Sequence, residues 1–109
     1  MTKLADGIWI IDAEAKTLYA NAAMGEILGA NAQELMGQPS FEYLYPEDVP
    51  AAQKLFDGKR QGDSNPFRFR LRRKDGTAVW VDVQGTPMRN ALGEFIGIVG
   101  TFRVANGRS

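Results

Sequence analysis

The sequence contains neither cysteine nor histidine. The missing cysteine excludes disulfides, a thiolate nucleophile, a thiol adduct to a chromophore and cysteine-based zinc sites. The missing histidine excludes an imidazole general base, the ordinary proximal ligand of haem and a phospho-accepting histidine. The remaining carboxylates, hydroxyls and lysines form no P-loop, GxGxxG or GxSxG motif. We therefore expect no catalytic residues, no metal site and no enzyme activity.

An excess of charge and long apolar runs are missing as well. Thirteen basic side chains balance thirteen acidic ones, so the overall charge favours neither nucleic acid nor an anionic membrane as a partner. No apolar run approaches the roughly 18 residues of a membrane span, and the first residues do not resemble a signal peptide. We expect a cytoplasmic protein that neither binds nucleic acid nor inserts into a membrane. Its 109 residues suffice for one small domain with a single core.

The last third of the sequence is rich in β-strand formers. Residues 67–72 alternate apolar and cationic side chains, residues 78–83 alternate again, and residues 95–102 form a third apolar run. A period of two is typical of strands that have one face on a core and the other in water. The short connections between these runs predict an antiparallel meander whose apolar face must be covered.

The alternation also predicts the register of the first hairpin. A three-residue loop with Gly76 in the left-handed conformation pairs Phe69 with Val81 on the apolar face. A two-residue Asp-Gly loop would instead place the Asp82 carboxylate on that face, which is unfavourable. On the outer face the longer loop makes a cation–aromatic pair and an opposite-charge pair, namely Arg70 with Trp80 and Arg68 with Asp82.

Residues 7–12 predict a further strand that is apolar on both faces. We expect Ile8 and Ile10 to face the core. Trp9 and Ile11 then lie on the outer face of the sheet. Two interpretations of these apolar side chains stay open. Either the preceding residues shield them or they remain partly exposed, or else they contact a second subunit.

Residues 17–20 predict a second strand, and short helices follow it. Asn21 and Asn31 are expected to cap the first two of these helices, and a glycine ends each of them. Asp48 is expected to cap a longer helix that continues to Gly58, or to pair with a nearby basic side chain. The order of two strands, several short helices and three strands predicts an α+β fold, with one five-stranded antiparallel sheet and the helices packed on one face.

The ordered set of these motifs resembles that of the PAS domain family of sensory modules. The similarity runs from about Leu4 to Val104 and rests on residues 6–12, 19–23, 34–37 (ELMG, similar to EELLG), 45–48 (YPED, similar to HPED) and 72–81. It implies the strand order 2-1-5-4-3. After Val104 the chain departs from the family, in which a short acidic motif and a signalling helix usually follow. We therefore expect residues 1–109 to be a single PAS-like domain excised from a larger signalling protein.

The resemblance implies a non-catalytic sensory or interaction module of a bacterial-type signal-transduction protein. Such a module regulates a fused or neighbouring output domain, for example a histidine kinase or a diguanylate cyclase, through dimerisation or small-molecule binding. The absence of cysteine and histidine disfavours thiol-adduct flavin and haem, so we expect no cofactor, and a noncovalent flavin is the alternative. An enzyme on a similar scaffold would instead need carboxylates that converge in a cleft.

The candidate ligand pocket lies between the helices and the sheet. Its expected boundary is apolar and consists of Ile10, Leu28, Phe41, Leu44, Phe56, Phe69, Val81 and Ile98. The same side chains also suit the plain core that any small domain needs. A homodimer is expected to bury the outer face of the sheet, including Trp9, Ile11 and Trp80. The cationic residues of the 68–74 segment are expected to be a solvated outer face.

Overall fold

The structure is a computed structural model that describes residues 6–105. It contains one antiparallel sheet of five strands in the order β2-β1-β5-β4-β3, and buried residues of the helices share one core with residues of this sheet. The predicted α+β fold and its strand order are therefore confirmed. The predictions about a cover formed by the first residues and about the C-terminal tail fall on residues outside the described part of the chain.

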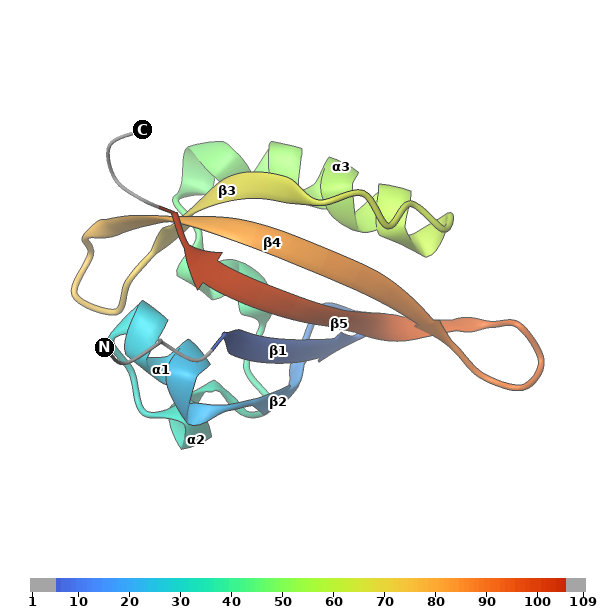
Figure 1. Ribbon diagram of the computed structural model, residues 1–109, viewed down its shortest axis with the longest axis horizontal. Helices are drawn as coiled ribbons and strands as arrows, with labels where there is room; N and C mark the ends of the chain where they lie inside the picture. The colour runs from blue at the N-terminus through green and yellow to red at the C-terminus, as the bar shows by residue number, and fades with distance from the viewer. Residues whose placement is uncertain (1–5, 106–109) are drawn as a thin grey trace.

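The chain order of the elements follows the predicted sequence of strands, helices and strands. The strands are β1 (Gly7–Asp12), β2 (Thr17–Ala20), β3 (Phe67–Arg72), β4 (Ala78–Arg89) and β5 (Phe95–Val104). Between β2 and β3 lie the helices α1 (Ala22–Leu28), α2 (Ala32–Leu35) and α3 (Val49–Arg60), with the 3₁₀ helices η1 (Ser40–Tyr43) and η2 (Pro46–Asp48). Figure 1 shows α3 on the β3 side of the sheet and α1 with α2 on the β1–β2 side.

Asparagine caps begin α1 and α2 as predicted. The Asn21 carboxamide oxygen accepts hydrogen bonds from the backbone N–H groups of Met24 and Ile8, both at 2.9 Å. The same side chain therefore caps α1 and joins it to β1, and Gly29 ends the helix with a φ of 68°. Asn31 and Glu34 form a capping box at the start of α2.

The hairpin of β3 and β4 has the predicted register. Phe69 is opposite Val81 on the apolar face, and Gly76 has a φ of 91°. On the outer face the Arg68 guanidinium lies 2.7 Å from the Asp82 carboxylate. The inward placement of a carboxylate, which would follow from the shorter loop, is thereby avoided.

Strand β4 extends to Arg89, well beyond the predicted end at residue 83. Gly85 and Pro87 weaken any strand prediction, because glycine packs no side chain and proline lacks a backbone donor. Strand β3 begins at Phe67, which is opposite Val83, so the half of β4 beyond Val83 pairs only with β5. This half of β4 is an edge of the sheet, and an edge strand tolerates a proline. The strand therefore continues past Gly85 and Pro87 to Arg89, beyond the predicted end.

The predicted orientation of β1 is wrong. Trp9 is only 5% exposed, and Ile11 packs against the same core. Ile8 and Ile10 alternate with them along β1 and are half-buried on the opposite face. Both faces of this strand are apolar, so the larger indole takes the interior, where it buries more surface and finds a hydrogen-bond partner.

The most deeply buried part of the core comes from α1, α2 and β4. The largest fully buried side chains are Met24, Leu28, Leu35 and Val81. None of these four lines the cavity beneath α3 and η1. The incompletely filled part of the interior lies instead beneath α3 and η1.

Candidate functional site

A cavity of about 120 Å³ lies between the sheet and the segments η1 and α3. Its walls are almost entirely apolar. Of the predicted pocket residues, those that line the cavity are Phe41, Leu44, Phe56, Phe69 and Ile98. Leu28 and Val81 belong to the filled core and do not reach the cavity. Ile10 was predicted there wrongly because it lies on the other face of β1, while Trp9 and Ile11 line the cavity in its place.

Two glycines form part of the cavity wall on the sheet. Gly85 of β4 is directly opposite Gly100 of β5, and both line the cavity. A Cβ atom added to Gly85 would lie 3.3 Å from Lys59 Cε and 3.4 Å from Ile98 Cγ2. A Cβ atom added to Gly100 would lie 2.8 Å from the Phe102 ring. The two glycines therefore allow neighbouring side chains to pack closely against the sheet, Lys59 and Ile98 over Gly85 and Phe102 over Gly100.

A lysine lines the same cavity. Lys59 of α3 is only 3% exposed, and its Nζ donates a hydrogen bond of 2.9 Å to the Asn65 carbonyl oxygen. The Nζ atom lies 5.3 Å from the centre of the Phe67 ring. Burial lowers the pKa of the Lys59 ammonium, and the charge of the Asp63 carboxylate opposes this shift.

Sequence reasoning missed Lys59, although the sequence carries a signal for it. The residue follows Ala52 by seven positions and Phe56 by three, and both of those are buried. A lysine at this spacing continues the apolar stripe of the helix and so points at the core. Its charge suggested a solvent-exposed position, whereas the long side chain buries its full length here.

Ser40 is the second hydrogen-bonding side chain that the sequence analysis overlooked. It opens η1, is 9% exposed and lines the cavity. Its backbone N–H donates to the Ala15 carbonyl oxygen at 2.8 Å. Its hydroxyl is buried and has no hydrogen-bond partner within residues 6–105. Buried polar atoms are nearly always paired, so an unpartnered hydroxyl at a cavity is a notable feature.

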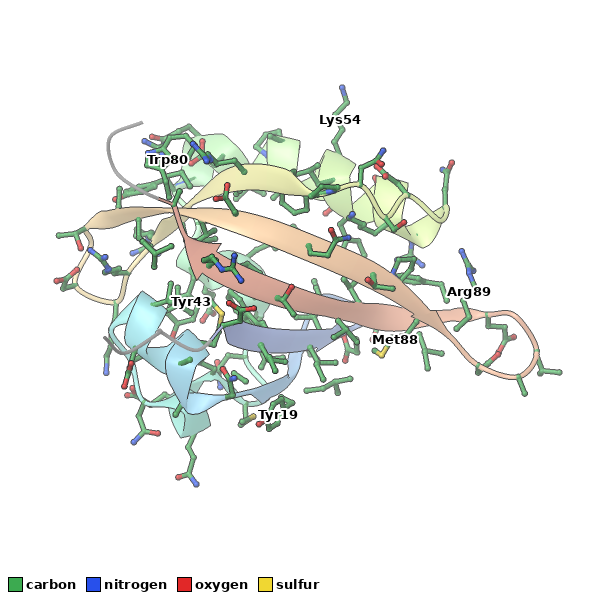
Figure 2. The ribbon with its side chains drawn as sticks, viewed as in Figure 1. Tyr19, Tyr43, Lys54, Trp80, Met88 and Arg89 are labelled. Carbon is green, nitrogen blue, oxygen red and sulfur yellow. The ribbon has the colours of Figure 1, made fainter. Side chains whose placement is uncertain are left out.

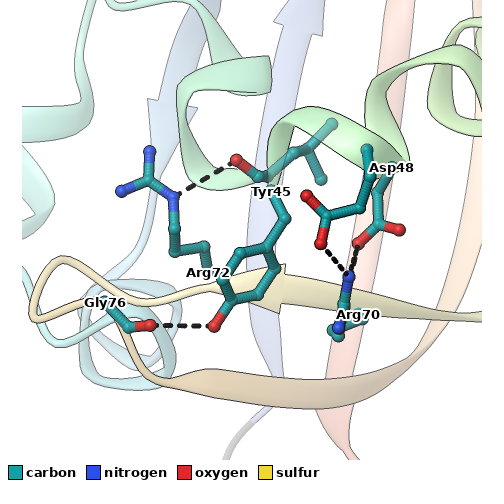
Figure 3. A network of polar contacts seen from close by, with 7 residues as sticks. Tyr45, Asp48, Arg70, Arg72 and Gly76 are labelled. Carbon is teal, nitrogen blue, oxygen red and sulfur yellow. Dashed lines mark hydrogen bonds and ion pairs between the residues drawn. The ribbon is translucent and has the colours of Figure 1, made fainter.

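A polar network holds the segment from η1 to η2 against the β3–β4 hairpin (Figure 3). The Tyr45 hydroxyl donates to the Gly76 carbonyl oxygen at 2.8 Å. The Arg72 guanidinium donates to the carbonyl oxygens of Leu44 and Glu42, at 3.2 and 2.8 Å. Because Leu44 lines the cavity, these bonds fix one of its walls.

Of the two roles predicted for Asp48, the structure shows the pairing with a base and not the helix cap, and Arg70 contacts another aromatic ring than predicted. The Asp48 side chain makes no capping bond at the start of α3. It instead accepts a hydrogen bond of 2.9 Å from Arg70 Nε (Figure 3), since a nearby guanidinium offers a charge-assisted bond. Arg70 is opposite Trp80 in the sheet, but its guanidinium lies over the Tyr45 ring, 4.4 Å from the ring centre.

The replacement of Arg72 by methionine tests how much this network contributes to stability. We expect the free energy of unfolding to fall by about 2 kcal/mol, because the two carbonyl oxygens lose charge-assisted bonds. Urea denaturation followed by circular dichroism measures the change. Arg103→Met is the matched control, since its ion pair with Asp6 is exposed and should contribute no more than about 1 kcal/mol. Equal losses in the two variants would contradict the proposed role of the network.

The cationic 68–74 segment is paired within the chain. Its acceptors are Asp82 for Arg68, Asp48 and Glu47 for Arg70, the carbonyls of Leu44 and Glu42 for Arg72, the Ile27 carbonyl for Arg73, and Glu34 for Lys74. No carboxylate lines the cavity in the described part of the chain. Between residues 6 and 105, His, Cys, Asp and Glu also form no group of three that could hold a metal ion.

The chain belongs to the PAS family, because the model of the PAS fold matches residues 1–105. PAS domains are sensory modules. The PAS domain of a Colwellia psychrerythraea protein is 21% identical with a TM-score of 0.84, and the match covers 94% of this chain and 88% of that one. No curated protein sequence matches the chain.

Two further solved structures share the fold. A light-oxygen-voltage domain, studied with a flavin analogue, is 21% identical with a TM-score of 0.80, and the match covers 94% of this chain and 78% of that one. A domain ascribed to a light and redox sensing histidine kinase from Haloarcula marismortui is 24% identical with a TM-score of 0.78. This match covers 94% of this chain and 91% of that one. Within residues 6–105, no helix has the length and apolar character needed to span a membrane.

Proposed function

We propose that this PAS domain senses by binding a small molecule in the cavity beneath η1 and α3. The cavity itself carries the proposal, because small domains normally fill such space with side chains. Its volume of about 120 Å³ is close to the roughly 150 Å³ of an engineered cavity that binds benzene. The ligand is accordingly a compound with about one ring.

The domain in this proposal is a non-catalytic module of a cytoplasmic signal-transduction protein. Ligand binding changes the activity of a fused or neighbouring output domain, such as a histidine kinase or a diguanylate cyclase. The alternative is a noncovalent flavin, as the fold shared with a light-oxygen-voltage domain suggests. Its three fused rings need more space, since pockets for larger ligands measure roughly 300–1,000 Å³. The size of this cavity therefore favours the smaller ligand.

Native mass spectrometry and thermal unfolding test ligand binding directly. We expect either a copurified small molecule or a saturable rise of Tm with members of a panel of single-ring compounds. Gly85→Ala is the matched variant, because its added methyl group contacts only side chains and reduces the cavity. This variant should stay folded and respond more weakly. A wild-type protein that shows only its own mass and an unchanged Tm at millimolar concentrations would refute the proposal.

Self-association is the second part of the proposed function. Trp80 is 52% exposed on the outer face of the sheet, and Tyr19 is also exposed (Figure 2). An exposed tryptophan is a common anchor of protein interfaces. Trp9 and Ile11 no longer belong to this candidate interface, because they face the interior. Sedimentation should show a dimer that Trp80→Ala weakens, and a wild-type monomer at several hundred micromolar would contradict this part.

A further inference from the structure

The buried lysine restricts the chemistry of the ligand that the proposed function requires. An ammonium group has three donors, and within residues 6–105 the Lys59 Nζ uses one of them, toward the Asn65 carbonyl oxygen. No carboxylate forms an ion pair with this side chain in the described part of the chain. Burying a cation is costly unless an anion or several hydrogen bonds compensate for the lost water.

Lys59 lines the cavity, and its ammonium lies close to two other residues of the wall. Its Nζ would be 3.8 Å from a Cβ atom on Gly85 and is 5.3 Å from the centre of the Phe67 ring. Gly85 and Phe67 both line the cavity. An anionic group bound between them would receive charge-assisted hydrogen bonds from the free donors of Nζ.

The other walls describe the remainder of the ligand. Phe41 and Phe56 meet edge to face, with ring centres 6.4 Å apart, and both line the cavity. Such aromatic walls suit a flat apolar body. Ser40 lines the same cavity, and its hydroxyl, which has no partner within residues 6–105, offers one hydrogen bond to a polar substituent on that body.

We propose that the cavity binds a small aromatic monocarboxylate, with its carboxylate at Lys59 and its ring among the phenylalanines. This inference rests on the proposed function, for which it names the class of ligand. Uncharged single-ring compounds lack the group that compensates the buried cation and bind more weakly. A carboxylate of about the size of benzoate matches the cavity volume of about 120 Å³.

Calorimetric titrations with benzoate and benzamide test the charge requirement, because the two compounds share a ring and differ in charge. We expect wild-type protein to bind benzoate about tenfold or more tightly than benzamide, as a charge-assisted bond requires. In Lys59→Met this preference should disappear, because benzoate loses the charge-assisted bond that distinguishes it from benzamide. Lys54→Met is the matched control, since Lys54 lies on the same helix and points into solvent (Figure 2). This control should bind both compounds like wild type.

Lys59→Met is expected to remain folded, because replacing buried charged groups by apolar side chains of similar volume is often neutral or stabilising. Should it unfold, Lys59→Gln gives the same comparison with an uncharged polar side chain. Undiminished benzoate binding in the folded variant would overturn the inference. The inference also fails if wild type binds benzamide and benzoate equally, but the proposed function then stands. If neither compound nor any other member of the single-ring panel binds, both fail together.

Ser40→Ala tests the second polar contact. We expect one of the three hydroxybenzoate isomers to bind wild type more tightly than benzoate does, and this gain should vanish in Ser40→Ala while benzoate binding is kept. If no isomer gains affinity, or the gain survives in Ser40→Ala, the contact between the ligand and the Ser40 hydroxyl is excluded.

Discussion

Replacing Trp9 with alanine is expected to lower the free energy of unfolding by about 3–5 kcal/mol, the range found for large buried aromatic side chains. The indole packs against the rings of Tyr43 and Phe102, with ring centres 6.1 and 5.6 Å away. Its Nε1 donates to Thr17 Oγ1 at 2.9 Å. The variant therefore leaves a void and also a buried threonine hydroxyl without its partner. Chemical denaturation followed by circular dichroism measures the loss.

Trp80→Ala is the matched control for Trp9→Ala, since both variants remove an indole from the sheet. Trp80 is half exposed on the outer face, so its removal should change the free energy of unfolding by no more than about 0.5 kcal/mol. Its effect should appear in self-association instead. If Trp9→Ala were as stable as wild type, or changed only the oligomeric state, the inward orientation of β1 would be refuted.

Gly97→Ala is expected to lower the free energy of unfolding by about 3 kcal/mol or more, because overpacking and backbone strain add together. Gly97 has a φ of 156° and is paired with Asp12 of β1. A Cβ atom at this position would overlap the backbone carbonyl oxygen of Ile11. Backbone atoms cannot move aside as a side chain can, so β1 and β5 would separate locally. Thermal and urea unfolding measure the effect.

Gly93→Ala separates backbone strain from the steric overlap at Gly97. Gly93 has a φ of 84° and stands in open space, so an alanine there is strained but meets no neighbour. We expect this control to lose only about 1–2 kcal/mol, the strain of a left-handed alanine. Equal losses in Gly97→Ala and Gly93→Ala would show that β1 does not approach β5 as closely as described.

The sequence predicted the sheet better than the orientation of its first strand. In the β3–β4 hairpin only one register keeps the Asp82 carboxylate off the apolar face, so chemistry selects it uniquely. Strand β1 has apolar residues on both faces, and periodicity alone cannot say which face is inside. The inward face of β1 is the one that carries Trp9, whose indole donates a hydrogen bond to Thr17. This bond depends on how β1 pairs with β2, which the local pattern does not reveal.

The apolar part of the candidate site was predictable in the same way. Phe41, Phe56 and Phe69 were expected at the pocket and line it, because aromatic residues at helix and strand periods point inward. The polar residues and the glycines of the cavity wall were not predicted. The pairing of Gly85 with Gly100 is a long-range feature, and the buried Lys59 side chain packs closely against Gly85. Neither follows from local sequence patterns.

Methyl NMR during a titration with benzoate tests most directly that the cavity beneath η1 and α3 is the binding site. The methyl groups of Ile98 and Leu55, which line the cavity, should shift progressively and reach saturation. Those of Ile96 and Leu92, which are exposed, should stay in place. Unchanged Ile98 and Leu55 signals at saturating benzoate, or shifts confined to the exposed methyl groups, would contradict ligand binding in the interior.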